Sequence, residues 1–312
     1  MDASLELDCD AIVDDPEPGY AGLAKQLEVL KTRTVATQHE CSCVLPMSLT
    51  DLRSVEVPEG EHDDVAQMAI ESLREYYEDF DQRITRTWQH EETPHDMAMV
   101  SSVSVRSSIA ETIVDDLKSV KLRCVGMDSL PFAMARAAEL GSFSRKDEPI
   151  ALLDWGHSTV TLVIARNGRP EFVRRLRDCN GRDAIESLAQ GLRLDSTDIL
   201  HVLATCGLPA AGAHATSNAA TEKIQRLLIP ELDKVCAELQ KTLLYLRHHL
   251  RKLMPSQLVL FGGMATIPQI SSAFQERCGL ETTPWKLNSR NSHVSDAVYG
   301  VAMAASVGRN WT

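Results

Sequence analysis

Residues 150–168 contain the side chains in this sequence that are best suited to holding a charged ligand. An apolar run stops at Asp154 and resumes after Thr159, which predicts two strands joined by a turn. Gly156 frees the backbone to bend and to bring amide groups close to an anion. Ser158 and Thr159 add hydroxyl donors, and Asp154 could hold a metal ion that neutralises phosphate charge. The alternative is an ordinary turn closed by an aspartate.

A double glycine after a buried strand is the second candidate. The run LVLF is followed by Gly262-Gly263, and a helix is expected to begin near Pro268. Two glycines let a flat ring or a phosphate approach the main chain, and a helix start favours anions. The alternative is a tight strand-to-helix turn.

The elements that must position these two stretches alternate between strand and helix. In the second half we expect strands over 150–154, 159–165, 169–178 and 256–261, helices over 180–192, about 224–252, 267–278 and 295–308, and a loop over 207–221. In the first half we expect helices over 22–31, about 62–80, 108–120 and 130–140, strands over 39–46, 52–58, 84–91, 97–104 and 121–129, and a linker over 141–149. This order predicts α/β domains with helices on the faces of sheets.

Composition excludes several classes of protein. The net charge of −12 argues against a nucleic-acid binder, which needs a basic face. No run approaches the ~18–20 apolar residues of a membrane span, so a soluble cytoplasmic protein is the simplest interpretation. Of the eight cysteines, only Cys41 and Cys43 are closely spaced, and no second pair completes a zinc set.

Several segments taken together resemble PilM, the cytoplasmic actin-like protein of type IV pilus assembly. The resemblance is carried by VLPMSLTDLRSVEVPEG, VGMDSLPFAMARAAEL, DWGHSTVTLVIARNGRPEFVRRL, CNGRDAIESLAQGLRLDSTDIL, ELQKTLLYLR and LVLFGGMATIPQI. It covers about residues 20–306, and the order of the motifs makes the set specific.

The resemblance implies an actin-like (ribonuclease H-like) α/β fold of two domains, 1–149 and 150–312, with an inserted α+β subdomain at about 48–125. ATP would lie in a cleft between the domains, with Mg²⁺ held by Asp154 through water. The nucleotide-binding residues it implies are Asp154, Gly156, Ser158, Thr159, Gly181, Glu238, Lys241, Gly262, Gly263 and Met264. Glu238 and Lys241 are three residues apart and share a helix face, so the alternative for them is a solvated ion pair.

The resemblance also implies a binding and assembly protein, at most a weak ATPase, at the inner membrane through its partners. The expected partner is the cytoplasmic tail of a PilN-like membrane protein, docked as an extended peptide on the first domain. The inserted subdomain would contact other pilus components, and self-association is a further expectation.

One feature of the family pattern is not found in this sequence. PilM proteins begin with a phosphate hairpin, Asp-Ile-Gly-Ser-Ser-x-x-Lys, and residues 11–30 align with the family segment directly after that hairpin. We therefore expect an incomplete first domain and a weakened phosphate clamp. Two other hypotheses remain: a degenerate actin-like domain that binds no nucleotide, and a small-molecule kinase relative. The kinase needs a positioned carboxylate base, and Asp154 is the single candidate.

Overall fold

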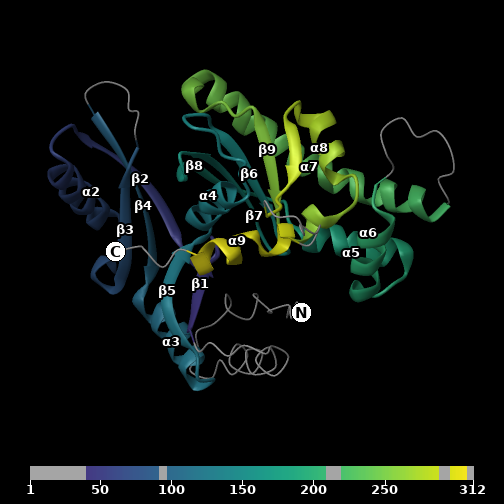
Figure 1. Ribbon diagram of the computed structural model, residues 1–312, viewed down its shortest axis with the longest axis horizontal. Coiled ribbons are helices and arrows are strands. Elements are labelled where there is room, and N and C mark those ends of the chain that lie inside the picture. The colour runs from purple at the N-terminus through teal and green to yellow at the C-terminus, as the bar shows by residue number, and fades with distance from the viewer. Residues whose placement is uncertain (1–39, 91–96, 209–218, 288–295, 308–312) are drawn as a thin grey trace. The chain divides into compact units, whose positions relative to one another are not determined.

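The computed structural model describes residues 40–90, 97–208, 219–287 and 296–307 (Figure 1). By its internal contacts the chain divides into two compact units, Met1–Ser129 (unit 1) and Leu130–Thr312 (unit 2). Helix α4 (Leu130–Leu140) follows this division and packs on the sheet of unit 2. The predicted domains 1–149 and 150–312 stay a prediction.

Unit 1 contains a parallel pair of strands, β1 (Glu40–Leu45) and β5 (Arg123–Ser129). Helix α3 (Ser107–Ser119) contacts β5. Its apolar face meets β1 and β4 in a small core that consists of Leu45, Val105, Ile113, Leu117 and Val120. This core fixes the two strands against the helix that precedes β5 in the chain.

The second sheet of unit 1 is antiparallel, with the order β2-β4-β3. Its strands are β2 (Asp51–Pro58), β3 (Arg83–Gln89) and β4 (Met97–Arg106), and helix α2 (His62–Tyr76) contacts all three. The α2 residues in its core recur at helical spacing, and the strand residues alternate, as half-buried elements require. That core consists of Val55, Val57, Val65, Ala69, Leu73, Tyr77, Ala98 and Val100. These elements lie in sequence between β1 and β5, and the predicted bounds of the insertion, about 48–125, stay a prediction.

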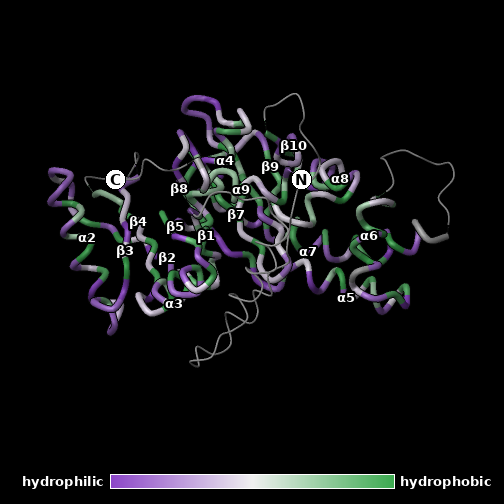
Figure 2. Tube along the Cα trace, turned by 60° about the horizontal axis from the view of Figure 1, so that its bottom comes forward, coloured by the Kyte–Doolittle hydropathy of each residue, from purple (hydrophilic) through white to green (hydrophobic). Residues whose placement is uncertain are grey.

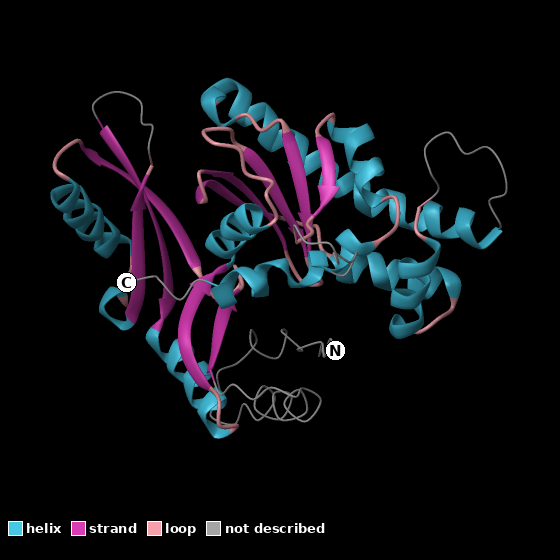
Figure 3. Ribbon diagram, viewed as in Figure 1, coloured by secondary structure: helices cyan, strands magenta, loops and turns pink. Residues whose placement is uncertain are grey.

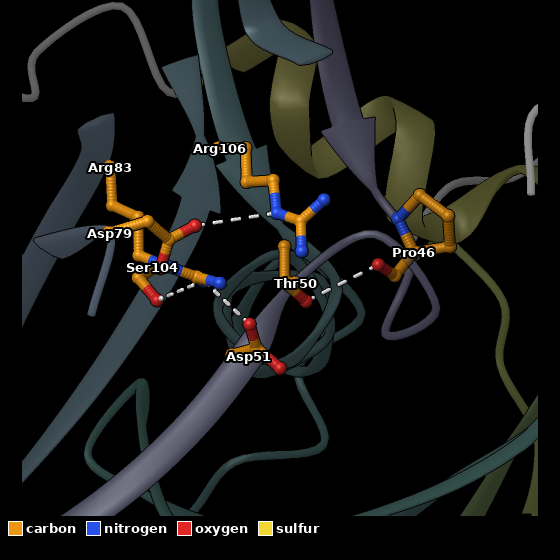
Figure 4. A network of polar contacts seen from close by, with 7 residues as sticks. All are labelled: Pro46, Thr50, Asp51, Asp79, Arg83, Ser104 and Arg106. Carbon is orange, nitrogen blue, oxygen red and sulfur yellow. Dashed lines mark hydrogen bonds and ion pairs between the residues drawn. The ribbon is translucent and has the colours of Figure 1, made fainter. Parts of the chain in front are cut away.

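Arg83 joins the strands of this sheet at one end (Figure 4). Its side chain is only 7% exposed, and its Nη1 atom lies 2.6 Å from Asp51 Oδ2 on β2. The same nitrogen donates to Ser104 Oγ on β4 at 3.3 Å, and Nε donates to Asp79 Oδ1 at 2.8 Å. The hydrogen bond from Arg83 holds the pKa of Asp79 below its ordinary value. The Arg83 guanidinium therefore connects β2, β4 and the turn that precedes β3.

Unit 2 is built on a five-stranded sheet with the order β10-β9-β6-β7-β8 (Figure 3). The strands are β6 (Ile150–Trp155), β7 (Val160–Arg166), β8 (Arg169–Leu176), β9 (Gln257–Phe261) and β10 (Glu281–Pro284). Strands β6, β9 and β10 are parallel, whereas β6, β7 and β8 form an antiparallel meander. Strands β6 and β7 are buried along nearly their whole length, which matches their apolar sequence (Figure 2).

Helices cover both faces of this sheet. Helix α4 contacts β6, β7 and β8, and it packs on α9 (Asp296–Val307). Trp285 links this side through a hydrogen bond from its Nε1 to the Ala137 carbonyl, at 2.6 Å. The other helices of the unit are α5 (Gly181–Leu192), α6 (Ser196–Cys206), α7 (Ala219–His249) and α8 (Ile270–Cys278). The α8 side is joined to β6 by an edge-to-face contact between Trp155 and Phe274.

Most expected elements are confirmed within the described residues, with shifted ends. Helix α2 stops at Tyr76 instead of near 80, because the short 3₁₀ turn η2 (Phe80–Gln82) leads the chain into β3. Helix α7 ends at His249, and a 3₁₀ turn, η3 (Arg251–Leu253), follows it. Helix α6 and strand β10 are not among the expected elements. The predicted helix over 22–31, and the region around the expected missing hairpin, lie outside the described residues.

Candidate functional site

The parallel strands β6 and β9 end side by side, and this places the two candidate turns together. Asp154 on β6 is paired with Phe261 on β9, so the residues that follow both strands meet at one edge of the sheet. Gly262 has a φ of +87°, which residues other than glycine rarely adopt. A Cβ atom there would lie 2.5 Å from the Trp155 carbonyl oxygen and 2.7 Å from Asp154 Oδ1. The double glycine therefore allows close contact with the end of β6.

Asp154 is a half-buried carboxylate at this edge. Removal from water raises its pKa to about 6, and no hydrogen bond to its carboxylate is found within the described residues. In the same part of the chain, no three His, Cys, Asp or Glu side chains gather into a metal site. Within the described residues, a cation at Asp154 would therefore take most of its ligands from water or a bound anion.

The tip of the β6–β7 hairpin is closed by its own backbone and by the start of α5. The Gly156 amide donates to the Thr159 carbonyl at 3.1 Å. The amides of Gly181 and Arg182, the first two of α5, donate to the carbonyls of Gly156 and His157 at 2.9 and 2.8 Å. These two helix amides are therefore occupied by the hairpin and do not point at a ligand.

Gly181 is required at this contact because of space. A Cβ atom there would lie 2.9 Å from the Gly156 carbonyl oxygen and 3.3 Å from Cγ of Met264. Met264 belongs to the 3₁₀ turn η4 (Gly263–Thr266), directly after the double glycine. In contrast, a Cβ atom on Gly263 would meet nothing within 4 Å. The hairpin tip, the start of α5 and the double-glycine turn are thus packed against one another.

A cavity of about 1020 Å³ opens beside the hairpin tip, between β8, α5 and α7. Four of the predicted site residues line it: Ser158, Thr159, Glu238 and Lys241. The remaining lining residues are Arg175, Leu176, Arg177, Asp178, Cys179, Asn180, Asp183, Lys234 and Ala237. Four of the lining side chains are cationic and three are acidic, so the cavity offers charged groups of both signs to a polar ligand.

Glu238 is already paired in this structure. Its Oε1 atom accepts from Lys241 Nζ and its Oε2 atom from Arg174 Nη2, each at 2.5 Å. The hydrogen bond from Lys241 is the largest cause that lowers the Glu238 pKa, and Arg174 adds to it. Arg174 also donates to Thr242 Oγ1 at 2.7 Å. The pair is therefore the ion pair that the sequence spacing allowed, and it also lines the cavity, while its role in nucleotide binding stays a prediction.

The predicted site residues fall into two groups that share the hairpin. Those packed around the ends of β6 and β9 are Asp154, Gly156, Gly181, Gly262, Gly263 and Met264, and those that line the cavity are Ser158, Thr159, Glu238 and Lys241. Their role in nucleotide binding, and a cleft between the two domains, stay predictions. The sequence analysis missed Arg175, Arg177 and Lys234 in the cavity wall. The signal available for Arg175 and Arg177 was the basic run RPEFVRRLRD on the strand after the hairpin, whereas Lys234 lies on α7.

Comparison with known proteins supports the fold. No family model and no curated protein sequence matches the chain. Among solved structures, a chain of the PilM–PilN type IV pilus biogenesis complex matches with a TM-score of 0.70 and 20% identity, over 93% of this chain and 85% of that one. EutJ, an ethanolamine utilization protein from Carboxydothermus hydrogenoformans, matches with a TM-score of 0.45 and 14% identity, over 64% and 60% of the two chains. MreB5 of Spiroplasma citri bound to AMPPNP matches with a TM-score of 0.49 and 16% identity, over 65% of this chain and 64% of that one.

The PilM match extends over both units, and it confirms the fold expected from the sequence. The chain has the actin-like α/β fold of PilM. Within the described residues, no helix combines the length and the apolar character that a membrane crossing requires.

Proposed function

We propose that this chain is a PilM-like scaffold of type IV pilus machinery, or of a related secretion machine, whose state depends on a bound nucleotide. The observation that carries the proposal is the structural match to a chain of the PilM–PilN complex over 93% of this chain. Many unrelated functions can share one fold. The motifs of the sequence therefore have to agree with it, and their order along the chain does.

The nucleotide would bind at the hairpin and the cavity of unit 2. A volume of about 1020 Å³ is ample for a mononucleotide, since pockets for small ligands commonly measure ~300–1,000 Å³. Lys234 is held by Glu231 and Lys241 by Glu238. Within the described residues, neither Arg175 nor Arg177 has a carboxylate partner, so two arginines that line the cavity remain available for phosphate oxygens.

Mg²⁺ fits the residues at the end of β6. Asp154 offers a carboxylate that lacks a hydrogen-bond donor in the described structure, and a cation would compensate its burial. Mg²⁺ in nucleotide sites is usually held by one or two carboxylates, several waters and the phosphates. The ion would neutralise phosphate charge, and Asp154 would hold it through water.

The partner we propose is the cytoplasmic tail of a PilN-like membrane protein. That tail would dock as an extended peptide on the first domain, while the inserted subdomain would contact other pilus components. The chain would then be a cytoplasmic protein held at the inner membrane by its partners. The expected activity is binding and assembly, with at most weak ATP hydrolysis.

Isothermal titration of the full chain with ATP and ADP, with and without Mg²⁺, tests the nucleotide part. We expect Mg²⁺ to strengthen ATP binding and Lys241→Ala to weaken it about 3- to 10-fold, as fits an exposed cation on an anionic ligand. Lys223→Ala is the matched control, because Lys223 is an exposed lysine of the same helix outside the cavity. An unchanged affinity in Lys241→Ala would leave the salt bridge as the role of this residue.

A second titration with a synthetic peptide of the PilN-like tail separates the scaffold from the nucleotide site. Peptide binding without any ATP binding would identify a degenerate actin-like scaffold that uses no nucleotide. ATP binding without peptide binding would overturn the proposed partner. Binding of both, with the peptide affinity changed by Mg·ATP, is the expected result.

A further inference from the structure

Helices α7 and α8 are joined at one place by two hydrogen bonds from the same face of α7. Asp233 Oδ1 accepts from Arg277 Nε at 2.7 Å, and Gln240 Nε2 donates to the Arg277 carbonyl at 2.6 Å. Positions 233, 236 and 240 are spaced by three and four residues, so they share one face of α7. The residue between the two anchoring contacts is Cys236, and the neighbour of Arg277 is Cys278.

The two thiols lie within reach of each other. Cys236 is buried at 3% exposure, Cys278 is half-buried at the last position of α8, and both are free cysteines. Each thiol has the largest influence on the pKa of the other, and the two contacts at Arg277 hold the α7 face that carries Cys236 against the end of α8 that carries Cys278. Gly279, directly after Cys278, adopts a left-handed conformation, and nothing lies within 4 Å of the position where its Cβ would be. Cys278 is therefore the member of the pair that solvent can approach.

The environment makes Cys278 the reactive sulfur. The hydrogen bond from the Cys236 thiol is the largest cause that lowers the Cys278 pKa, and the positive charge of Arg277 adds to it. The same hydrogen bond, followed by burial, raises the pKa of Cys236. Elsewhere, burial is the largest cause that raises the pKa of Cys43, which lies close to Cys41 and Cys124 in unit 1. Since the thiolate is the nucleophile, the cluster in unit 1 is the less reactive of the two.

We propose that Cys236 and Cys278 form an oxidation-sensitive pair, which an oxidant of the peroxide class converts into a reversible disulfide between α7 and α8. In the first step the Cys278 thiolate attacks a peroxide oxygen; an S–O bond forms, the O–O bond breaks, and hydroxide leaves and is protonated to water. In the second step the Cys236 sulfur attacks the sulfur of the Cys278 sulfenic acid: the S–S bond forms, the S–O bond breaks, and the leaving hydroxide takes up the Cys236 proton to give a second water. Two thiols are oxidised by two electrons in total, and one peroxide is reduced to two waters.

The disulfide would tie the central part of α7 to the end of α8 through the helix face that carries Cys236. Lys234, Ala237, Glu238 and Lys241 line the cavity from other positions on the same turns of the helix. Closing the loop between residues 236 and 278 restricts the unfolded chain, so the oxidised protein is expected to unfold at a higher temperature, by several degrees. The pair stands on contacts within unit 2 and does not depend on nucleotide binding.

The test uses the full chain, treated with a small excess of hydrogen peroxide and then alkylated and digested with trypsin without reduction. The expected product is a linked pair of tryptic peptides, residues 235–241 and 278–286, which dithiothreitol separates. A thermal melt of the oxidised and the reduced chain should show the upward shift. Cys278 oxidised to sulfinic acid without the linked pair would overturn the proposal, and so would linkage of Cys41, Cys43 or Cys124 in its place.

Three variants serve as controls. Because Cys278 is half-buried, Cys278→Ser should fold normally, yet it should give neither the linked peptides nor the thermal shift. Cys236→Ala should likewise lack the linkage and leave Cys278 open to further oxidation. Cys206→Ser, at an exposed cysteine of α6, should keep both the linkage and the shift. A thermal shift that persists in Cys278→Ser would refute the disulfide as its cause.

Discussion

Replacing Asp154 by asparagine is expected to stabilise unit 2 at neutral pH. Burial raises the Asp154 pKa to about 6, from 3.8 in an exposed aspartate. At about 1.36 kcal/mol per pH unit, holding this carboxylate ionised costs the folded chain about 3 kcal/mol above pH 7. Asparagine has nearly the same shape without the charge, but its amide also needs hydrogen-bond partners. We therefore expect a net gain of about 1–3 kcal/mol from Asp154→Asn at pH 7.5.

The sign of the pH dependence follows from the raised pKa. Between pH 3.8 and about 6, the folded state holds a proton on Asp154 that the unfolded state has released. The stability of the unmodified chain therefore falls as the pH rises through this window. Asp154→Asn lacks this slope, so its advantage should be small near pH 4, grow up to about pH 6, and stay constant above pH 7.

Tryptophan fluorescence during urea unfolding is a suitable assay, because Trp155 and Trp285 are both fully buried in unit 2. Midpoints would be compared at pH 4, 5, 6 and 7.5. Asp178→Asn is the matched control: it removes one negative charge at an exposed position of the cavity wall. An Asp154→Asn variant that is no more stable than the unmodified chain at pH 7.5, or whose advantage is the same at every pH, would refute the reasoning.

Two further predictions concern the glycine turn and the Arg83 network. Gly262→Ala should lower the free energy of unfolding by about 2–4 kcal/mol, because its φ of +87° and the Trp155 carbonyl at 2.5 Å leave no room for a Cβ. Gly263→Ala should change it by less than about 0.5 kcal/mol, since nothing lies within 4 Å; equal losses in the same urea titration would contradict this. Arg83→Met should destabilise unit 1 by about 1–3 kcal/mol through loss of its bonds to Asp51 and Ser104. Circular dichroism during thermal unfolding measures this loss, and an unchanged melt would show that the network contributes nothing.

Much of unit 2 could be predicted because its elements are fixed by local sequence. Strands β6 and β7 are apolar runs with one polar turn between them, and α5 begins at an Asn-Gly pair whose Asn180 side chain caps the helix. Strand β10 could not be predicted, because its ETTP sequence has four residues and little apolar character; it exists because it pairs with β9. The formation of β10 therefore depends on pairing with β9, which the sequence of residues 281–284 alone does not reveal.

The candidate site shows the same division between local and distant causes. Asp154 and Gly262 were identifiable because each directly follows an apolar run in the sequence. Arg174 could not be assigned to Glu238, because that pair forms only when α7 lies across β8, 64 residues further along the chain. The spacing of Glu238 and Lys241 predicted that they share a helix face. The cavity they line depends on how α7 packs on α5 and β8. The spacing of two residues on one helix gives no information about that packing.

Asp154, at the end of β6, is poorly explained by folding alone. Asp154 is a carboxylate removed from water without a donor in the described structure, and its burial lowers stability at neutral pH. A turn that served only the fold would be improved by the Asp154→Asn change. Natural proteins carry such unfavourable features mainly at sites that bind or react. An Asp154→Asn variant that is more stable and binds Mg·ATP more weakly would connect the cost directly to the proposed nucleotide site, whereas a gain in stability with unchanged Mg·ATP affinity would separate the two.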